Sequence, residues 1–529
     1  MLDHLLGSST LQLKRHVFDW NILWAAVVLL VLYQTAKMLY RAHFHPLRSI
    51  PGPWISSTTS LWIRWQRWHG RLSFEADKLM AKYGPIVRID PNLVILNDPS
   101  EVEKIFIRKD LDTSPESIRA LRVGGHDWTV TYPQHSIARS RRHPVMIATT
   151  TKNLKLRHDI FVENIEAMVR DLGISLGKRS EDIVHHLRIC TLKNSQVIMG
   201  GSKVDIPTSD FPHVVGEYNF LVVWRLCLPE WLFSWLQHSP FTHASFRIRS
   251  SDRLFDLGAE LCRQAKANDK PFDEDPSIYK LFTDPDAKYP TQTWNDAELG
   301  AEMAGQVLAA TETTSSALAF IYYELALNPA LQRSLYEELR AHEGYEDLDS
   351  LKLLDACIKE GLRFRPPVAL TGSRLVPAGG LRVLGYYLPA GTVVTTQSLS
   401  MSRRRPDLFP DFDTFNPLRW LECPDSDEGS KNESLKSEIL NNESSKNDVS
   451  KTEMADKKKL LVPFGVGARR CPGGNMATYQ MRLLLKAVFE RFEVRVAPET
   501  TPEKMSPFEA NGYRSRHDRC NLVFVPRQT

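Results

Sequence analysis

The sequence feature that most constrains the fold is a glycine-rich turn around one cysteine, LLVPFGVGARRCPGGNMA, at residues 460–477. It leads into GNMATYQMRLLLKAVFERF, where apolar residues recur at helical spacing. We therefore expect Cys471 just before the first turn of a helix, in a loop whose glycines let the backbone approach another group closely. A dinucleotide-binding loop is excluded, because the third glycine of G-x-G-x-x-G would fall at Arg470.

Three roles are compatible with the immediate surroundings of Cys471. A helix amino terminus and the neighbouring Arg469 and Arg470 favour the thiolate, which is the form that binds metals and attacks substrates. A nucleophile would also need a base, which a distant histidine could supply. A structural cysteine that fills space in a turn is the simplest interpretation of the residue taken alone.

The composition excludes several other classes of protein. The chain has 529 residues with 67 Lys and Arg against 63 Asp and Glu, and this net charge of +4 argues against general nucleic-acid binding. Its seven cysteines are scattered and form no C-x-x-C, which disfavours a secreted disulfide scaffold, a zinc ribbon and a thioredoxin-like centre. No H-E-x-x-H suggests a zinc protease. We expect a reducing compartment and no nucleic-acid partner.

An apolar run near the amino terminus, ILWAAVVLLVLYQTAKMLY, predicts a membrane anchor at residues 22–41. A cleaved signal peptide and a buried core helix are the alternatives. The run is long for a signal peptide, starts some twenty residues in and lacks a small-x-small exit. More Lys and Arg residues follow the run than precede it, so the positive-inside rule predicts a lumenal segment at 1–21 and a cytoplasmic catalytic part.

The remaining sequence predicts one large α-rich domain with small sheets at residues 61–529, preceded by a proline-rich connector at 42–60. Helical patterning dominates, and short β-like segments interrupt it, namely PIVRID, NLVILN, LRVLGYYLP, TVVTTQ and FEVRVA. Residues 422–459 hold no aromatic and are crowded with Ser, Asn, Glu and Lys. This composition predicts a disordered insertion.

The cysteine turn, read as Phe464-x-x-Gly467-x-Arg469-x-Cys471-x-Gly473, resembles the haem-binding loop of the cytochrome P-450 family. The resemblance implies that the Cys471 thiolate is the axial ligand of a haem b iron and that Arg469 contacts a haem propionate. In this role the glycines would aim amide N–H groups at the sulfur and the phenylalanine would shield it.

Two further segments resemble family elements that support the core beneath the haem. LDACIKEGLRFRPP places Glu360 and Arg363 at i and i+3 and matches the Glu-x-x-Arg element of the K-helix, although such a spacing is usually an ordinary surface ion pair. FNPLRW supplies Arg419, which the resemblance adds to the same network. The acidic residue that usually precedes this arginine is Leu418 here, which suggests a different local partner.

The segment AEMAGQVLAATETTSSALAF resembles the family's oxygen-activation helix. Glu312 and Thr313 match the acid–alcohol pair that bends this helix, opens room for dioxygen and relays protons. Ala310 stands where the family usually has glycine, so its methyl group could crowd the oxygen groove or reshape the substrate pocket. Taken alone, the segment would read as a Thr-rich helix face packed in the core.

Further cations could bind the haem propionates. His135 and Arg139, in HSIAR, resemble the Trp/His-x-x-x-Arg element of the C-helix, and Arg374 lies just past the K-helix, where the family commonly places another propionate partner. Each of these residues could instead be a solvated surface charge. The run RSRRH could dock a reductase, contact lipid headgroups or remain solvated.

The resemblance implies a cytochrome P-450 fold, with the haem between the oxygen-activation helix and the cysteine-loop helix, and a monooxygenase reaction. No flavin or dinucleotide domain is visible, so electrons from NADPH would come from a separate membrane-bound flavoprotein reductase. The alternatives are a haem-thiolate isomerase or dehydratase, a peroxide-driven enzyme and a haem gas sensor.

The region YRAHFHPLRSIPGPW also resembles fungal microsomal members that tailor secondary metabolites. It implies an endoplasmic-reticulum membrane and a lipophilic substrate such as a terpenoid, polyketide or alkaloid. The apolar run FLVVWRLCLPEWLFSWL and residues 368–371 are either pocket segments or ordinary core.

Overall fold

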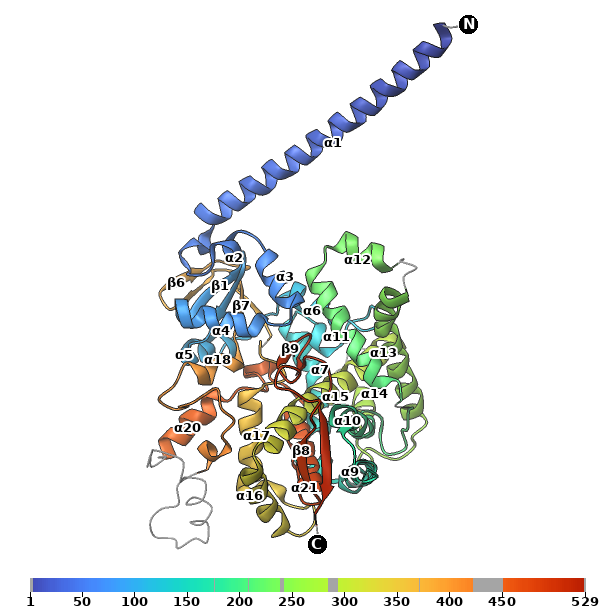
Figure 1. The fold of residues 1–529 in the computed structure, drawn as a ribbon, viewed down its shortest axis with the longest axis vertical. Coiled ribbons are helices and arrows are strands. Elements are labelled where there is room, and N and C mark those ends of the chain that lie inside the picture. The colour runs from blue at the N-terminus through green and yellow to red at the C-terminus, as the bar shows by residue number, and fades with distance from the viewer. Residues whose placement is uncertain are drawn as a thin grey trace.

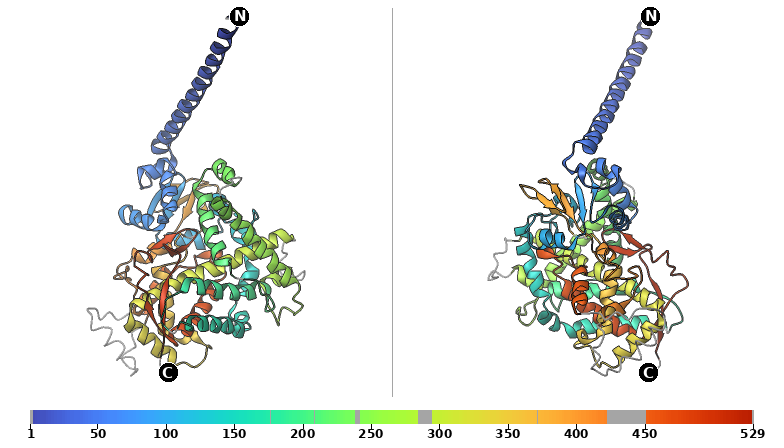
Figure 2. Two further views of the ribbon diagram at one scale, coloured as in Figure 1. Left: turned by 45° about the vertical axis from the view of Figure 1, so that its right-hand side comes forward. Right: turned by 90° about the vertical axis from the view of Figure 1, so that its left-hand side faces the viewer.

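The structure is a computed structural model that describes residues 3–527 except 176, 208, 238–241, 284–293, 371 and 422–450. It is mainly α-helical with small β-sheets, as the sequence predicts, and its first helix projects away from the domain (Figure 1). Figure 2 shows this helix leaving the same end of the domain in both further views.

The amino-terminal helix α1 (Asp3–His43) runs without a break through the boundary expected at residue 22. Its part Ile22–His43 is long and apolar enough to cross a membrane, and none of it is buried. This exposure contradicts the alternative of a buried core helix. The candidate span ends two residues beyond the predicted end at 41.

Residues 42–60, the predicted connector, pack against the domain. They contain the short helices η1 (Pro46–Ser49) and α2 (Trp54–Thr58). Leu47 and Ile50 are buried. The prolines stop α1 as expected, because their rings cannot continue a helix, but the segment is an attached part of the domain and not a free spacer.

Helix α15 (Asp296–Leu327) passes through the centre of the domain (Figure 1). It begins at a capping box, in which the Asn295 side chain accepts a hydrogen bond from the Glu298 N–H at 2.8 Å. Helices α10 and α13 pack along it. Because neighbours surround it, most of its residues are buried, which explains its lack of a polar face.

The other α-helices surround this centre. They are α3 (Leu61–Trp68), α4 (Leu72–Tyr83), α5 (Pro99–Val102), α6 (Pro115–Arg119), α7 (His135–Ala148), α8 (Thr151–Lys155), α9 (His158–Gly173), α10 (Ile183–Gly200), α11 (Phe211–Cys227), α12 (Glu230–Gln237), α13 (Thr242–Lys266), α14 (Ile278–Thr283), α16 (Pro329–Arg340), α17 (Lys352–Phe364), α18 (Ser398–Arg403), α20 (Lys451–Leu460) and α21 (Gly474–Phe489). Shorter turns are η2 (Glu103–Ile107), η3 (Thr129–Thr131), η4 (Leu348–Ser350), η5 (Pro417–Trp420) and η6 (Gly467–Arg469).

The strands form small sheets, and the predicted β-like segments contain β1, β2, β5, β6, β7 and β8, whereas β3, β4, β9, β10 and β11 were not predicted. One sheet has the order β1-β2-β7-β4, in which β2 and β7 are parallel, and a second has the order β3-β11-β8. The pairs β5–β6 and β9–β10 are antiparallel. The strands are β1 (Ile86–Asp90), β2 (Leu93–Leu96), β3 (Glu181–Asp182), β4 (Arg374–Leu375), β5 (Leu381–Val383), β6 (Tyr386–Leu388), β7 (Val393–Thr395), β8 (Phe492–Val496), β9 (Pro507–Glu509), β10 (Tyr513–Ser515) and β11 (Asn521–Pro526).

The predicted disordered insertion at 422–459 is wrong for its last part. Residues 451–459 belong to α20, in which Met454 and Leu460 are buried in an apolar cluster. Lys457 is also buried and pairs with Glu453 at 2.8 Å. The polar composition of the segment hid one apolar position, Met454, which packs with Leu460 just beyond the segment. Residues 422–450 lie outside the described residues.

Candidate active site

The cysteine loop joins η6 to α21, as the sequence predicts. The Cys471 N–H donates to the Phe464 carbonyl oxygen at 2.7 Å, and the Gly473 N–H hydrogen-bonds the Cys471 thiol. Gly467 has a φ of +71°, and a Cβ there would overlap the carbonyl oxygen of Phe106 in η2. Only glycine satisfies both conditions at residue 467. The loop is therefore shaped to present one sulfur atom with an amide donor beside it.

The Cys471 side chain has solvent-exposed surface. Protein atoms nevertheless surround the thiol closely, and this burial raises its pKa. The Gly473 N–H and the charges of Arg142 and Arg470 act in the opposite direction but do not outweigh burial. The charge of Arg470 favours the thiolate, as the sequence predicts, and burial opposes it. A cation bound at the sulfur would have to supply the missing stabilisation.

The accessible part of α15 lies at its middle. Ala309, Ala310 and Thr313 are half-buried, whereas Thr311 and Thr314 are buried in the core. The Thr313 hydroxyl donates to the Ala309 carbonyl oxygen at 2.7 Å. The threonine-rich segment is therefore two-sided, with Thr313 on the accessible side and two other threonines in the core.

Glu312 is buried and paired on another side of α15. The Arg188 guanidinium of α10 donates to both Glu312 carboxylate oxygens, at 2.7 and 2.9 Å, and also to both oxygens of Asp518. Burial lowers the pKa of Arg188, but the carboxylates of Glu312 and Asp518 outweigh burial and raise this pKa above its ordinary value. The Asp518 side chain is 28% exposed, so this ion-pair network connects Glu312 to the surface.

Cations gather beside the cysteine loop. Burial and the nearby charges of Arg469 and Arg142 lower the pKa of Arg374 to about 10. Burial and Arg142 lower the pKa of Arg469 to about 10, although Asp112 opposes them. Burial lowers the pKa of His135, and Arg469, Arg139 and Arg374 lower it further, against Asp110. Buried cations that repel one another in this way form a site for an anion.

Arg142, in α7, belongs to this group although sequence reasoning missed it. It is buried and donates to the carbonyl oxygen of Arg470. The predicted Arg139 is exposed instead. The run RSRRH is thus no continuous surface patch, since Arg141 is buried as well. The available signal was the spacing of Arg142 from His135, which is i and i+7 on one helix.

Glu360, Arg363 and Arg419 form one buried network. Arg363 donates to both Glu360 oxygens at 2.8 Å, and the Arg419 Nε lies 3.2 Å from the Glu360 Oε1. The Trp420 indole N–H and the Asn416 backbone N–H complete the coordination of this carboxylate, at 2.8 and 2.9 Å. Glu360 is fully buried, so this is not an ordinary surface ion pair.

Arg419 also donates to the carbonyl oxygens of Pro410 and Asp411, at 2.8 and 3.3 Å. The resemblance places an acidic residue where this chain has Leu418. The two backbone carbonyl oxygens are the local partners of Arg419 here.

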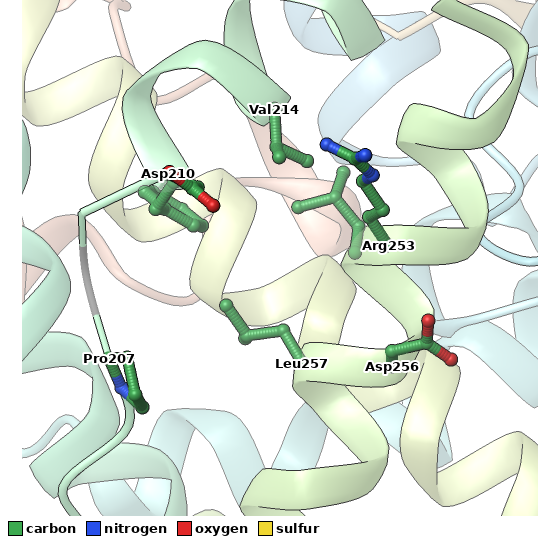
Figure 3. Close-up of a pocket in the computed structure, with 8 residues that line it drawn as sticks. Pro207, Asp210, Val214, Arg253, Asp256 and Leu257 are labelled. Carbon is green, nitrogen blue, oxygen red and sulfur yellow. The ribbon is translucent and has the colours of Figure 1, made fainter. Parts of the chain in front are cut away.

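A pocket of about 280 Å³ lies elsewhere, between α11 and α13 (Figure 3). It is lined by Pro207, Asp210, Phe211, Val214, Arg253, Leu254, Asp256 and Leu257. None of these residues belongs to the predicted site. The run FLVVWRLCLPEWLFSWL, considered for the substrate pocket, divides between buried positions of α11 and the exposed Trp231 and Trp235 of α12.

The residues present fit a haem. One accessible cysteine with an amide donor suits an axial thiolate ligand, and the Arg142, Arg374 and Arg469 cluster suits the propionates. Ala309 and Ala310 give the accessible face of α15 small, apolar side chains, which suit the face of a flat macrocycle. In the described residues no group of three or more His, Cys, Asp or Glu could hold a bare metal ion. These features define a haem-thiolate protein.

The sequence comparisons agree with this class. The sequence matches the Cytochrome P450 family over residues 50–515, and the chain belongs to that family. The chain is therefore an enzyme of the cytochrome P450 monooxygenase class with a haem-thiolate iron.

Similar proteins cover nearly the whole chain. Cytochrome P450 monooxygenase aneF of Aspergillus aculeatus is 26% identical over 508 residues, covering 90% of this chain and 94% of that protein. The averantin hydroxylase of Dothistroma septosporum is 25% identical, covering 90% and 86%. The solved structure of the retinoic acid bound cyanobacterial CYP120A1 has a TM-score of 0.67 at 20% identity, covering 90% of this chain and 99% of that chain.

We expect Glu360→Gln to lower the free energy of unfolding by about 3 kcal/mol, because it leaves two buried guanidinium groups without their carboxylate. Urea unfolding of the purified protein, followed by far-UV circular dichroism, measures this change. Glu337→Gln, at an exposed position of α16, is the control and should change stability by less than about 0.5 kcal/mol. Equal midpoints for the two variants would contradict a supporting role for Glu360.

Proposed function

We propose that this protein is a haem-thiolate monooxygenase that oxidises a lipophilic small molecule in fungal secondary metabolism. Electrons come from NADPH through a separate flavoprotein reductase. The observation that carries the proposal is the pairing of a complete cysteine motif with Thr313 on the accessible face of α15. Relatives named as monooxygenases and as a hydroxylase support the reaction class.

The haem, when bound, supplies the activation of dioxygen. Cys471 holds the iron, while Arg469, Arg374 and Arg142 offer cationic donors to the propionates. The Gly473 N–H and the packing of Phe464 near the loop limit water at the sulfur and tune its basicity. These groups bind and orient the cofactor and take no part in proton transfer.

Proton delivery belongs to Thr313 and Glu312. The Thr313 hydroxyl donates to a carbonyl of its own helix, so a rotation about χ1 frees its proton for the accessible face. Glu312 contacts Arg188, and Arg188 contacts the partly exposed Asp518. This network orients the Glu312 carboxylate, which would have to part from Arg188 before it could pass a proton to Thr313.

The substrate is a lipophilic terpenoid, polyketide or alkaloid. The small apolar side chains Ala309 and Ala310 on the accessible helix face support a nonpolar pocket. The reaction is a hydroxylation, epoxidation or related oxidation. Expression with a reductase in microsomes, followed by feeding of candidate lipophilic metabolites and mass spectrometry, tests this assignment. A product that appears without NADPH would instead support the isomerase or peroxide-driven alternatives.

The protein is anchored once in the endoplasmic-reticulum membrane, with its catalytic domain in the cytoplasm and residues 1–21 in the lumen. The candidate span in α1 supports an anchor. The Arg41 guanidinium donates to the Thr58 carbonyl oxygen at 2.9 Å and attaches the span to α2.

The end of the domain that bears the anchor also exposes aromatic side chains. Trp54 of α2, Trp65 of α3 and Trp231 and Trp235 of α12 are between 56% and 73% exposed. Figure 1 places α2, α3 and α12 at the end where α1 joins. Tryptophan side chains favour the membrane interface, since the ring is apolar and its N–H stays hydrated. We therefore propose that this end rests on the bilayer.

The haem assignment is tested by the carbon monoxide difference spectrum of the reduced protein. We expect the red-shifted thiolate band in the wild type and its loss in Cys471→Ala, because no other ligand replaces the sulfur. Cys262→Ala, which changes a half-buried cysteine of α13, should retain the band. A wild type without the band, or a Cys471→Ala variant that keeps it, would refute the assignment.

Thr313→Ala should keep the thiolate band but uncouple NADPH consumption from product. Loss of a proton-relay group lowers a rate by about 100-fold or more, and water pathways compensate in part, so we expect the product formed per NADPH to fall by at least about 5-fold. Thr313→Ser should restore coupling. Thr314→Ala, a buried neighbour on the same helix, is the control, and an equal loss in both alanine variants would argue against a relay.

The bilayer contact predicts quenching by brominated lipids. In nanodiscs with brominated acyl chains, Trp231→Phe and Trp235→Phe should each lower the fraction of tryptophan fluorescence that is quenched. Trp294→Phe removes a half-buried ring that packs on Phe282 and should leave that fraction unchanged. If all three variants behave alike, α12 does not rest on the membrane.

A further inference from the structure

One short segment touches both elements that face the haem. This bridge segment, residues 128–133, lies between α6 and α7 and contains η3. Its first residues contact α15, and its last residues contact the cysteine loop. Neither contact was predicted from the sequence, and the bridge segment itself lies outside the cysteine, acid–alcohol and Glu360 motifs.

At α15 the bridge segment is held by a buried carboxylate. The Thr129 N–H donates to the Glu302 Oε2 at 2.7 Å, and the Gln306 side-chain amide donates to the Glu302 Oε1 at 2.8 Å. Glu302 is fully buried. The Trp128 ring packs on Gly305, where a Cβ would overlap the ring. The hydrogen bond between Thr129 and Glu302 and the packing of Trp128 on Gly305 therefore fix the first residues of the bridge segment at one position along α15.

At the cysteine loop the bridge segment is held by Arg469. The two terminal guanidinium nitrogens of Arg469 donate to the carbonyl oxygens of Tyr132 and Pro133, at 3.0 and 2.6 Å. The remaining nitrogen, Nε, is buried and has no hydrogen-bond partner among the described residues. The direction in which Arg469 points is thus set by where the two bridge carbonyls lie.

The two attachments share one side of the site. Glu302, Gln306, Ala309 and Thr313 follow one another at i, i+4, i+7 and i+11, which places them on one face of α15. The bridge segment is therefore tied to the same helix face that carries the accessible Ala309 and Thr313. From there it reaches the arginine that the cysteine motif assigns to a propionate.

We propose that Glu302 is a positioning residue that fixes the bridge segment on α15 and, through the Tyr132 and Pro133 carbonyls, orients Arg469 toward the haem. This inference rests on the proposed haem function. Its physical basis is that a short, doubly anchored segment transmits a displacement at one end to the other. When the Glu302 tie is lost, the Arg469 acceptors move, and the propionate contact weakens.

A purely structural carboxylate would behave differently, and the chain offers a matched example. Glu338 of α16 is half-buried, whereas Glu302 is fully buried, but it likewise accepts two hydrogen bonds, from the Leu353 and Leu354 N–H groups at 2.8 and 2.9 Å. It joins α16 to α17, and among the described residues its hydrogen bonds reach neither the bridge segment nor Arg469. Substitution of Glu302 removes a hydrogen bond between α15 and the bridge segment, whereas substitution of Glu338 removes hydrogen bonds between α16 and α17.

The test is the rate at which full-length, haem-loaded protein in nanodiscs transfers its haem to excess apomyoglobin. We expect Glu302→Leu to accelerate transfer by about 10-fold, the usual cost of removing an outer partner of a metal site. Glu302→Gln keeps the shape and one acceptor oxygen, so its acceleration should be smaller. Gly305→Ala displaces Trp128 from the same joint and should act in the same direction. Glu338→Leu should stay within about 2-fold of the wild type.

The outcomes separate the two proposals. A wild type that holds no haem would refute the proposed function. A wild type that holds haem, with Glu302→Leu, Glu302→Gln and Gly305→Ala all transferring it at the wild-type rate, would overturn only the role of Glu302. Equal acceleration in Glu338→Leu would also overturn it, since it would reveal general destabilisation. Glu302→Gln is isosteric and keeps the test decisive if Glu302→Leu does not fold.

Discussion

Buried positive charge beside Cys471 is the constraint on which the site depends. Arg142, Arg374 and Arg469 lie close enough to lower one another's proton affinity, and burial adds to the cost of their charge. Such a cluster is stable only when anions offset it. In the proposed site, haem propionates would supply two negative charges, so the folded site and the cofactor would stabilise each other.

The same balance explains the state of Cys471. Burial raises its pKa despite two nearby arginines, so the protein alone favours the thiol. Iron would reverse this preference by binding the thiolate directly, as metal binding is coupled to ligand deprotonation. The buried Glu360 carboxylate binds Arg363 of its own helix and Arg419 from a distant segment, and so holds α17 against η5.

The sequence predicted the parts of the site that are local in the chain. The cysteine motif spans ten residues and carries its own turn chemistry, and the candidate anchor and about half of the strands follow from hydrophobic pattern. The cation cluster was predicted only in part. Arg139 and Arg142 sit in one basic run, and burial, which separates them, depends on packing against the remote cysteine loop.

The partners of Glu312 were also not predictable from the sequence. Arg188 and Asp518 are separated from Glu312 by more than a hundred residues, so only the fold brings them together. The end of the insertion was mispredicted because its polar composition outweighed Met454, which α20 buries together with Leu460 just beyond the segment. Local chemistry is readable in a sequence, whereas burial and long-range pairing are properties of the folded chain.

The packed connector has a consequence for how the enzyme meets its partners. Leu47 and Ile50 are buried, and Arg41 is hydrogen-bonded to α2. The junction between the anchor and the domain is therefore packed and not a flexible linker. Such a packed junction would restrict the tilt of the domain above the bilayer. Lipid-borne substrates and an electron donor in the same membrane would then always encounter the same faces of the domain, so diffusion in two dimensions delivers them already oriented.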